Sequence, residues 1–117
     1  MKEKKPRIRF SHIGVSLHAE LCGEIDHHTA KAIREEIDKQ IYTLLPKEIV
    51  LSLAGVGFMD SSGLGLIVGR LVTAKEVGAT MTLTGVDART MKIFEMAGLE
   101  RMRGLTIRPT EEKRCVK

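Results

Sequence analysis

The sequence predicts an α/β fold, a single domain in which a mixed sheet of four to five strands carries helices packed on it. Segments with strand periodicity alternate along the chain with segments in which apolar residues recur every three or four positions. The chain has 117 residues, of which 43% are hydrophobic, and this is enough for one core. No internal repeat or linker divides it.

Two strands are predicted at the start of the domain. Residues 7–10 alternate between basic and apolar side chains, and Gly14 offers a turn. Residues 15–21 then alternate again, with an apolar face made of Val15, Leu17, Ala19 and Leu21. We expect a hairpin or a pair of strands with that face buried.

The first helix is predicted over about residues 28–45. Asp26 and Thr29 supply side chains that can cap it, and Pro46 ends the pattern. Its apolar positions at helical spacing are Ile33, Ile37, Ile41 and Leu44. A nearly continuous apolar strand follows at residues 48–53.

The second helix is predicted from the Asp60-Ser61-Ser62 junction to about Val77, with Gly78 as its C-terminal cap. Its apolar positions are Leu64, Ile67, Val68, Leu71 and Val72. It also contains three glycines, Gly63, Gly65 and Gly69, and each costs about 1 kcal/mol relative to Ala. We expect close approach of the backbone at the helix start to be the reason for them.

Three shorter elements complete the predicted domain. A strand is expected at residues 81–84, a third helix begins after Asp87 and ends at Gly98, and a last strand covers residues 105–107. The third helix has an apolar face made of Met91, Phe94 and Ala97.

The charge distribution argues against a nucleic-acid partner. The chain carries a net charge of +4, and residues 1–9 and 101–117 each carry +4, so that residues 10–100 carry a net charge of −4. The basic excess therefore lies at the two ends. With three Phe, one Tyr and no Trp, the chain also lacks aromatic platforms for single-stranded bases.

Other classes of protein are disfavoured by simple counts. No apolar run approaches the roughly 20 residues that span a bilayer, and no apolar segment follows the basic start of the chain as in a signal peptide. We therefore expect a cytoplasmic protein without a membrane partner. Cys22 and Cys115 are far apart and lack CxxC spacing, which indicates neither a disulfide framework nor a zinc site.

The junction at residues 60–63 is the strongest candidate site. It places two hydroxyls and a carboxylate at a helix start, where backbone N–H groups and the helix dipole favour an anion. One of the three side chains can simply cap the helix, at about 1 kcal/mol, but one cap does not need three polar residues. We expect Phe58, Met59 and Leu64 to hold the turn against the sheet and to leave the hydroxyls exposed for modification.

Nucleotide-binding and catalytic interpretations fit less well. In a GxGxxG loop that starts at Gly55 the third glycine would fall on Asp60, and a P-loop needs a Gly-Lys-Ser/Thr ending that is absent here. A nucleophilic serine needs a histidine base, and the four histidines, at positions 12, 18, 27 and 28, lie outside any GxSxG context. The sequence predicts no catalytic residue, although a small phosphate- or nucleotide-binding domain stays an alternative.

A second polar cluster consists of Glu24, Asp26, His27 and His28. It lies at a strand-to-helix turn that could share one end of the sheet with the serines. Adjacent helix residues do not face each other, and position 32, at i+4 from His28, is an alanine, so no metal site is expected. Helix capping together with an acidic patch facing a partner is the simpler interpretation, and no cofactor is expected.

Read together, residues 23–30 and 58–65 closely resemble the anti-sigma factor antagonists of the STAS domain family, and most closely those of sporulation. The resemblance covers about residues 8–107. It leaves residues 1–7 as a basic N-terminal extension and residues 108–117 as a charged C-terminal tail. It implies a STAS-like single domain that is not an enzyme.

The resemblance also implies a regulatory cycle. Ser62 is the expected phosphorylation site, and the expected partner is a nucleotide-bound anti-sigma factor serine kinase. The unphosphorylated form binds this kinase and releases the sigma factor, which is sigma F in the sporulation branch, and a serine phosphatase reverses the phosphorylation. The partner-binding residues implied in this way are Glu24, Asp26, Asp60, Ser61, Ser62 and Gly63. An antagonist in a general stress sigma factor circuit is the alternative.

Overall fold

The computed structural model describes residues 7–110, which form one five-stranded sheet, three α-helices and a short 3-10 turn. The elements are β1 (Arg7–Ile13), β2 (Ser16–Ile25), α1 (Ala30–Leu44), β3 (Glu48–Met59), α2 (Ser61–Glu76), β4 (Thr80–Val86), α3 (Ala88–Met96), η1 (Leu99–Arg101) and β5 (Leu105–Pro109). The predicted α/β class with a mixed sheet is therefore confirmed. Residues 1–6 and 111–117, including most of both expected tails and Cys115, lie outside the described residues.

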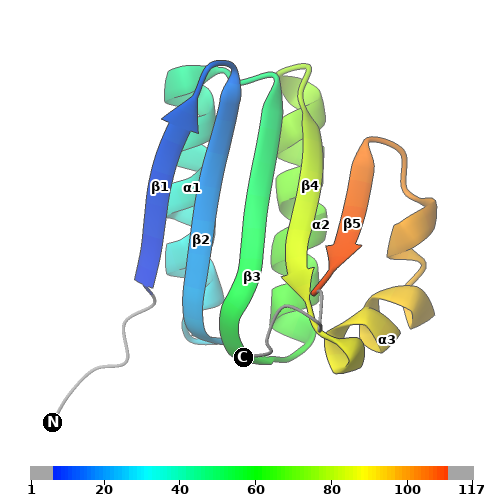
Figure 1. Cartoon of the computed structure of the whole chain (residues 1–117). Helices are drawn as coiled ribbons and strands as arrows, with labels where there is room; N and C mark the ends of the chain where they lie inside the picture. The colour runs from blue at the N-terminus through cyan, green and yellow to red at the C-terminus, as the bar shows by residue number, and fades with distance from the viewer. Residues whose placement is uncertain (1–6, 111–117) are drawn as a thin grey trace, which may run out of the picture.

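The order of strands across the sheet follows the order in the chain, β1-β2-β3-β4-β5. β1 pairs with β2 as an antiparallel hairpin, and the other three pairs of neighbours are parallel. A helix connects each of the parallel pairs, as parallel strands require (Figure 1). The carboxyl ends of β2, β3 and β4 and the starts of α1, α2 and α3 consequently lie at the same end of the sheet.

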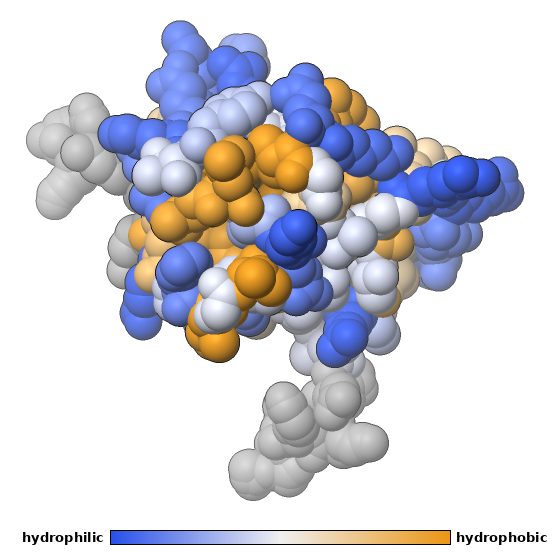
Figure 2. Space-filling model, turned by 90° about the horizontal axis from the view of Figure 1, so that it is seen from above, coloured by the Kyte–Doolittle hydropathy of each residue, from blue (hydrophilic) through white to orange (hydrophobic). Residues whose placement is uncertain are grey.

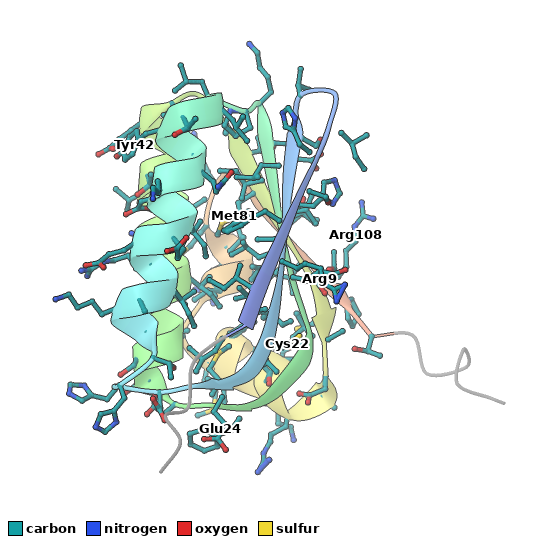
Figure 3. All side chains as sticks on the ribbon, turned by 90° about the vertical axis from the view of Figure 1, so that its left-hand side faces the viewer. Arg9, Cys22, Glu24, Tyr42, Met81 and Arg108 are labelled. Carbon is teal, nitrogen blue, oxygen red and sulfur yellow. The ribbon has the colours of Figure 1, made fainter. Side chains whose placement is uncertain are left out.

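The core lies between the sheet and the pair of helices α1 and α2, which cover one face (Figure 3). Side chains at alternate positions of the strands are buried there, as the pleat of a strand dictates. The fully buried members include Leu17, Leu21, Ile33, Ile37, Ile41, Ile49, Leu51, Ile67, Leu71 and Met81. Arg9 and Arg108 lie on the opposite face of the sheet, which none of the helices within residues 7–110 covers (Figure 3).

Three predicted apolar positions are exposed. Val15 is 60% exposed, because it lies in the turn between β1 and β2 and not within the alternating part of a strand. Val72 on α2 and Ala97 at the end of α3 are also exposed. Phe94 is the only buried residue of α3. The buried faces of α2 and α3 are thus narrower than expected.

The third strand is longer than expected. β3 continues from Glu48 to Met59, because β2 pairs with it as far as the Ile25–Met59 pair, with two register shifts on the way. The helix ends agree better with the sequence. Gly78 and Gly98 each have a φ of 76°, as predicted for glycines that follow a helix.

An ion pair that the sequence did not reveal joins the two covering helices. Arg70 of α2 is buried, and its Nε lies 3.2 Å from Oδ1 of Asp38 on α1. The two groups are not aligned as a hydrogen bond, so the contact is electrostatic. Burial lowers the pKa of Arg70, and the Asp38 carboxylate opposes this effect.

Exposed apolar side chains also gather at the end of the molecule that holds the β1–β2 turn and the end of α1 (Figure 2). Ile13, Val15 and Leu45 are each at least 60% exposed there. This is the end opposite to the helix starts. None of the helices within residues 7–110 has the length and hydropathy needed to cross a membrane.

Candidate functional site

The two polar turns predicted from the sequence lie side by side at one end of the sheet. Ile25, the last residue of β2, pairs with Met59, the last residue of β3. The N–H of Asp60 then donates a hydrogen bond of 3.3 Å to the carbonyl of Ile25. The expectation that both turns share one end of the sheet is therefore confirmed.

Asp60 alone caps α2. Its Oδ1 accepts a hydrogen bond of 2.8 Å from the Ser62 N–H, and its backbone is extended, as is usual at this position. Neither serine hydroxyl makes a hydrogen bond with any described residue. Ser61 is exposed and Ser62 is half-buried, so the two hydroxyls differ in their surroundings.

The backbone at this helix start is less open to an anion than expected. The Ser62 N–H is bonded to the Asp60 carboxylate, and the N–H groups of Gly63 and Leu64 donate to the Asp60 carbonyl at 2.9 and 3.4 Å. The N–H groups of Ser62 and Gly63 are among those that would otherwise hold a phosphate, whereas that of Leu64 makes the first regular bond of the helix. Asp60 therefore occupies much of the expected anion site.

Gly63 explains how close the turn lies to the sheet. A Cβ at this position would overlap Cγ of Met59 and would lie 3.3 Å from a methyl group of Ile25. The expected close approach is thus confirmed for Gly63, and it is wrong for Gly65 and Gly69, where a Cβ would meet no atom within 4 Å.

The apolar residues before the turn behave differently from one another. Met59 is half-buried and packs against the core, as expected. Phe58 was expected to hold the turn against the sheet as well, but it is 50% exposed, because the alternation along β3 directs it away from the core.

The neighbouring turn is organised by Asp26. Its Oδ1 accepts hydrogen bonds from the N–H groups of Thr29 (3.1 Å) and His28 (2.9 Å), and mainly the Thr29 bond lowers the pKa of Asp26 below its ordinary value. Thr29 was expected to cap α1, but its hydroxyl donates to the Glu24 carbonyl at 2.9 Å instead. Both side chains therefore fix the path of the chain from β2 into α1.

A hollow of about 300 Å³ lies beside Ser62, between the first turns of α1 and α2. It is lined by His27, Ala30, Lys31, Arg34, Ser62, Gly65 and Leu66. Sequence analysis had placed an acidic patch next to the serines, whereas the lining on the α1 side is basic. The spacing of three residues between Lys31 and Arg34, which puts both on one side of α1, was the signal that could have found it.

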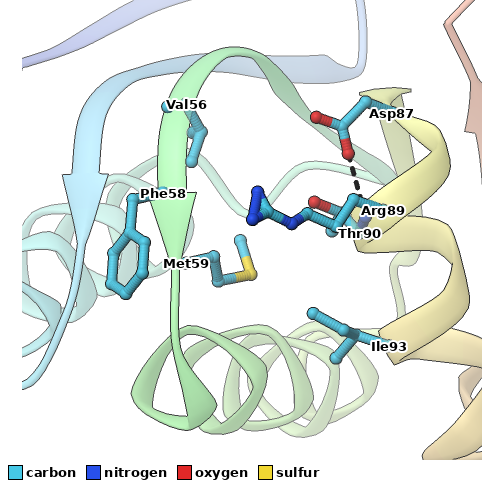
Figure 4. A pocket seen from close by; sticks show the side chains of 8 residues that line it. Val56, Phe58, Met59, Asp87, Arg89, Thr90 and Ile93 are labelled. Atoms are coloured by element: carbon cyan, nitrogen blue, oxygen red, sulfur yellow. Dashed lines mark hydrogen bonds between the residues drawn. The ribbon is translucent and has the colours of Figure 1, made fainter.

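A second cavity, of about 90 Å³, lies between the end of β3 and the start of α3. Figure 4 shows Arg89 reaching from α3 toward β3, with Ile93 one turn further along the helix. Asp87 accepts a hydrogen bond of 2.9 Å from the Thr90 N–H and so caps α3, as predicted. Sequence analysis did not assign this helix start to the site, although the carboxyl ends of neighbouring parallel strands must lie together.

Within residues 7–110, no group of three or more His, Cys, Asp or Glu side chains is arranged to hold a metal ion. The rings of His27 and His28 contact each other edge to face, with their centres 5.5 Å apart. The site instead offers the Ser62 hydroxyl beside the hollow between α1 and α2, and such a group is suited to modification or to contact with a partner.

The comparison with protein families agrees with this geometry. A family model described as the STAS domain matches residues 8–113. The chain belongs to the STAS domain family. The resemblance drawn from residues 23–30 and 58–65 is therefore confirmed.

Individual STAS relatives are regulatory proteins. An anti-sigma F factor antagonist of Paenibacillus polymyxa is 41% identical over 75% of this chain and 74% of its own length. An anti-sigma-B factor antagonist of Listeria monocytogenes is 31% identical over 68% of each chain. These names describe regulators and not enzymes, in agreement with the expectation that the chain has no catalytic activity.

Solved structures show the same STAS fold. The anti-sigma factor antagonist SpoIIAA in its unphosphorylated form superposes with a TM-score of 0.69 and 25% identity, over 92% of this chain and 93% of that one. The phosphorylated form of SpoIIAA from Bacillus gives a TM-score of 0.68 and 26% identity, over 92% and 95% of the two chains. This chain is thus about equally similar to both forms.

Proposed function

We propose that this STAS domain is an anti-sigma factor antagonist that is switched by phosphorylation of Ser62. The unphosphorylated form binds a nucleotide-bound anti-sigma factor serine kinase and releases the sigma factor that the kinase holds. The kinase inactivates the antagonist by phosphorylating Ser62, and a serine phosphatase restores it. The cycle takes place in the cytoplasm, without direct contact with nucleic acid or a membrane.

The position of the Ser62 hydroxyl is the observation that carries this proposal. Asp60 does the capping, so the hydroxyl of Ser62 is not needed for the cap, and Ser62 lines a hollow at this end of the sheet. Ser61 is more exposed but does not line that hollow. The similarity to both the unphosphorylated and the phosphorylated form of SpoIIAA supports a switch that changes the surface and not the fold.

The proposed contact surface surrounds this hydroxyl. We assign to it Glu24, Asp26, Asp60, Ser61, Ser62 and Gly63. Glu24 is exposed at the end of β2. Asp26 and Asp60 act by shaping their turns, since their carboxylates accept backbone N–H groups, and Gly63 acts by allowing the close approach to Met59. The domain proper is proposed to span residues 8–107.

A phosphate changes this surface strongly. It adds a charge of roughly −1.5 to −2 and three acceptor oxygens beside the Asp60 carboxylate. An interface that buries the Ser62 hydroxyl would lose space and a hydrogen bond, and it would weaken by roughly 2 to 5 kcal/mol.

Binding of two Ser62 variants to the kinase tests the proposal. Ser62→Ala cannot be phosphorylated and is expected to stay bound in the presence of ATP, whereas Ser62→Asp places a permanent charge in the interface and is expected to bind weakly. Titration calorimetry with the purified kinase and ADP measures both affinities, with Ser11→Ala, at an exposed serine of β1 outside the proposed contact surface, as the matched control that should behave as the unaltered chain. Equal affinity of Ser62→Ala and Ser62→Asp would contradict the switch.

The sporulation circuit of sigma F is the proposed setting, because the similarity to the anti-sigma F factor antagonist of Paenibacillus polymyxa is the stronger of the two. The 31% identity to the Listeria monocytogenes protein supports a general stress circuit as the second candidate. Binding of the unphosphorylated chain to a purified anti-sigma F factor and to a purified anti-sigma-B factor distinguishes these settings, since only the cognate kinase should bind it and release its sigma factor.

A further inference from the structure

Two basic side chains beside Ser62 have no acidic partner among the described residues. Lys31 and Arg34 line the hollow of about 300 Å³ that Ser62 also lines. The ion pairs within residues 7–110 are Arg9–Glu20 and Arg70–Asp38, so neither Lys31 nor Arg34 takes part in one. Asp38, one turn beyond Arg34 on α1, is already held by the buried Arg70.

These cations lie where a helix normally carries acidic residues. The first turns of α1 and α2 contain no Asp or Glu, and both helix starts point their positive ends toward this part of the molecule. Lys31 and Arg34 add to that positive potential instead of compensating it. The lining of the hollow therefore carries positive charge without a negative side chain of its own, and an anion bound there would be stabilised.

The backbone of α2 offers little to such an anion. The N–H groups of Ser62, Gly63 and Leu64 are already bonded to Asp60. A phosphoryl group on Ser62 must consequently find most of its hydrogen-bond donors among side chains. The nearest cationic ones that share its hollow are those of α1.

We propose that Lys31 and Arg34 of α1 form a seat for the phosphoryl group carried by Ser62. This proposal rests on the proposed function, in which Ser62 is the phosphorylated residue, and it adds which side chains bind the phosphoryl group. Charge-assisted bonds from an ammonium and a guanidinium group would hold the dianion in the hollow between α1 and α2. The phosphate on α2 would thus be held in one position on the surface and would link α2 to α1.

The second ionisation of the phosphate reports this contact directly. Nearby positive charges favour the dianion and lower the pKa of a phosphoserine from its usual value of about 6. His27 also lines the hollow, and the negative charge of Asp60 at the start of α2 acts in the opposite direction.

The experiment uses the full chain with phosphoserine incorporated at position 62 during translation, so that no kinase is required. Phosphorus NMR follows the titration of the phosphate in this protein and in Lys31→Gln/Arg34→Gln. We expect the double substitution to raise the pKa of the phosphate by about half a unit or more, roughly a threefold change in its ionisation constant. The same difference is expected when both proteins carry His27→Gln.

Lys39→Gln/Arg108→Gln is the matched control. It removes one Lys and one Arg that are exposed, one further along α1 and one on the opposite face of the sheet (Figure 3). Its phosphate should titrate as in the unaltered chain, because surface charges at a distance are screened by salt. Identical titration curves for Lys31→Gln/Arg34→Gln and the unaltered chain would overturn the seat. An equal shift in the control variant would also overturn it, since the effect would then follow net charge alone.

The proposed function can fail independently. Its failure would appear as absence of phosphate on Ser62 after incubation of the unaltered chain with the kinase, whereas the NMR titration depends only on the surroundings of residue 62.

Discussion

Asp60 separates the structural and the functional parts of the serine turn. Its carboxylate caps α2 through the Ser62 N–H, and its carbonyl accepts the next two N–H groups. The hydroxyl of Ser62 is then available at the edge of the hollow. A single side chain thus holds the helix start in place, and the hydroxyl two residues later takes no part in the cap.

Removal of this cap should destabilise the domain moderately. We expect Asp60→Ala to lower the free energy of unfolding by about 1 kcal/mol, because the Ser62 N–H loses its acceptor. Urea denaturation followed by circular dichroism measures the change. Asp60→Asn keeps a side-chain acceptor and should lose only a few tenths of that amount, and an equal loss in both variants would show that the charge and not the cap matters.

Sequence reasoning reached some of these residues and not others. Ser62 and Asp60 could be found because a strand followed by a helix fixes their place at the junction. Lys31 and Arg34 were missed because the side of α1 on which they lie matters only once α1 is packed against α2. The role of Thr29 was also missed, since two competing acceptors near a helix start cannot be ranked without coordinates.

At the scale of elements, α2 depends on one glycine much more than on the others. Gly63 lies against Met59 and Ile25, whereas a side chain at Gly69 would meet open space. The helix can therefore approach the end of β3 closely only at its first turn, which is where Ser62 lies.

This difference predicts opposite effects for the same substitution. Gly63→Ala should destabilise the domain by about 1 kcal/mol, because the cost of overlap with Met59 exceeds the gain in helix propensity. Gly69→Ala, its control on the same helix, should stabilise it by up to about 1 kcal/mol. Thermal unfolding of both variants measures the difference, and a stabilised Gly63→Ala would contradict the close approach.

The elements themselves followed from the sequence where the periodicity was long. The Ile33-Ile37-Ile41 spacing places α1 correctly, and alternation places Leu17, Ala19 and Leu21 of β2 in the core. The errors lie at element ends. β3 extends to Met59 through Gly55 and Gly57, and only pairing with β2 maintains a strand across such residues.

At the scale of the whole molecule, the topology brings three helix starts to one end of the sheet. Asp26, in the turn before α1, and Asp87, the cap of α3, both have a lowered pKa, mainly because each carboxylate accepts a backbone N–H, from Thr29 and Thr90 respectively. Stability at acid pH therefore depends on the same end of the molecule that carries Ser62.

The sign of the pH dependence follows from these shifts. A carboxylate whose pKa is lowered by folding stabilises the native state above its ordinary value of 3.8 and loses that contribution as the pH falls through the lowered value. Asp26→Asn/Asp87→Asn keeps acceptors but removes both titrations. As the pH is lowered from above 3.8 to below it, the urea midpoint of unfolding should fall more steeply for the unaltered chain than for this variant. Parallel curves of midpoint against pH would refute the assignment of this loss to Asp26 and Asp87.

The fold class followed from the alternation of strand and helix patterns, and the family followed from the resemblance carried by residues 23–30 and 58–65. The basic hollow beside Ser62 depends on how α1 and α2 pack, and Arg70 and Asp38, which join them, gave no signal in the sequence. The choice of partner also could not be predicted from the sequence, since it depends on the surface that the packed elements form together.

The most direct measurement is the site of phosphorylation. The full chain is incubated with the anti-sigma factor serine kinase of the source organism and ATP, digested, and mapped by tandem mass spectrometry. One phosphate on Ser62, retained in Ser61→Ala and absent from Ser62→Ala, is the expected result. A phosphate on Ser61, or none on the chain when the kinase is active toward another antagonist, would contradict the central claim.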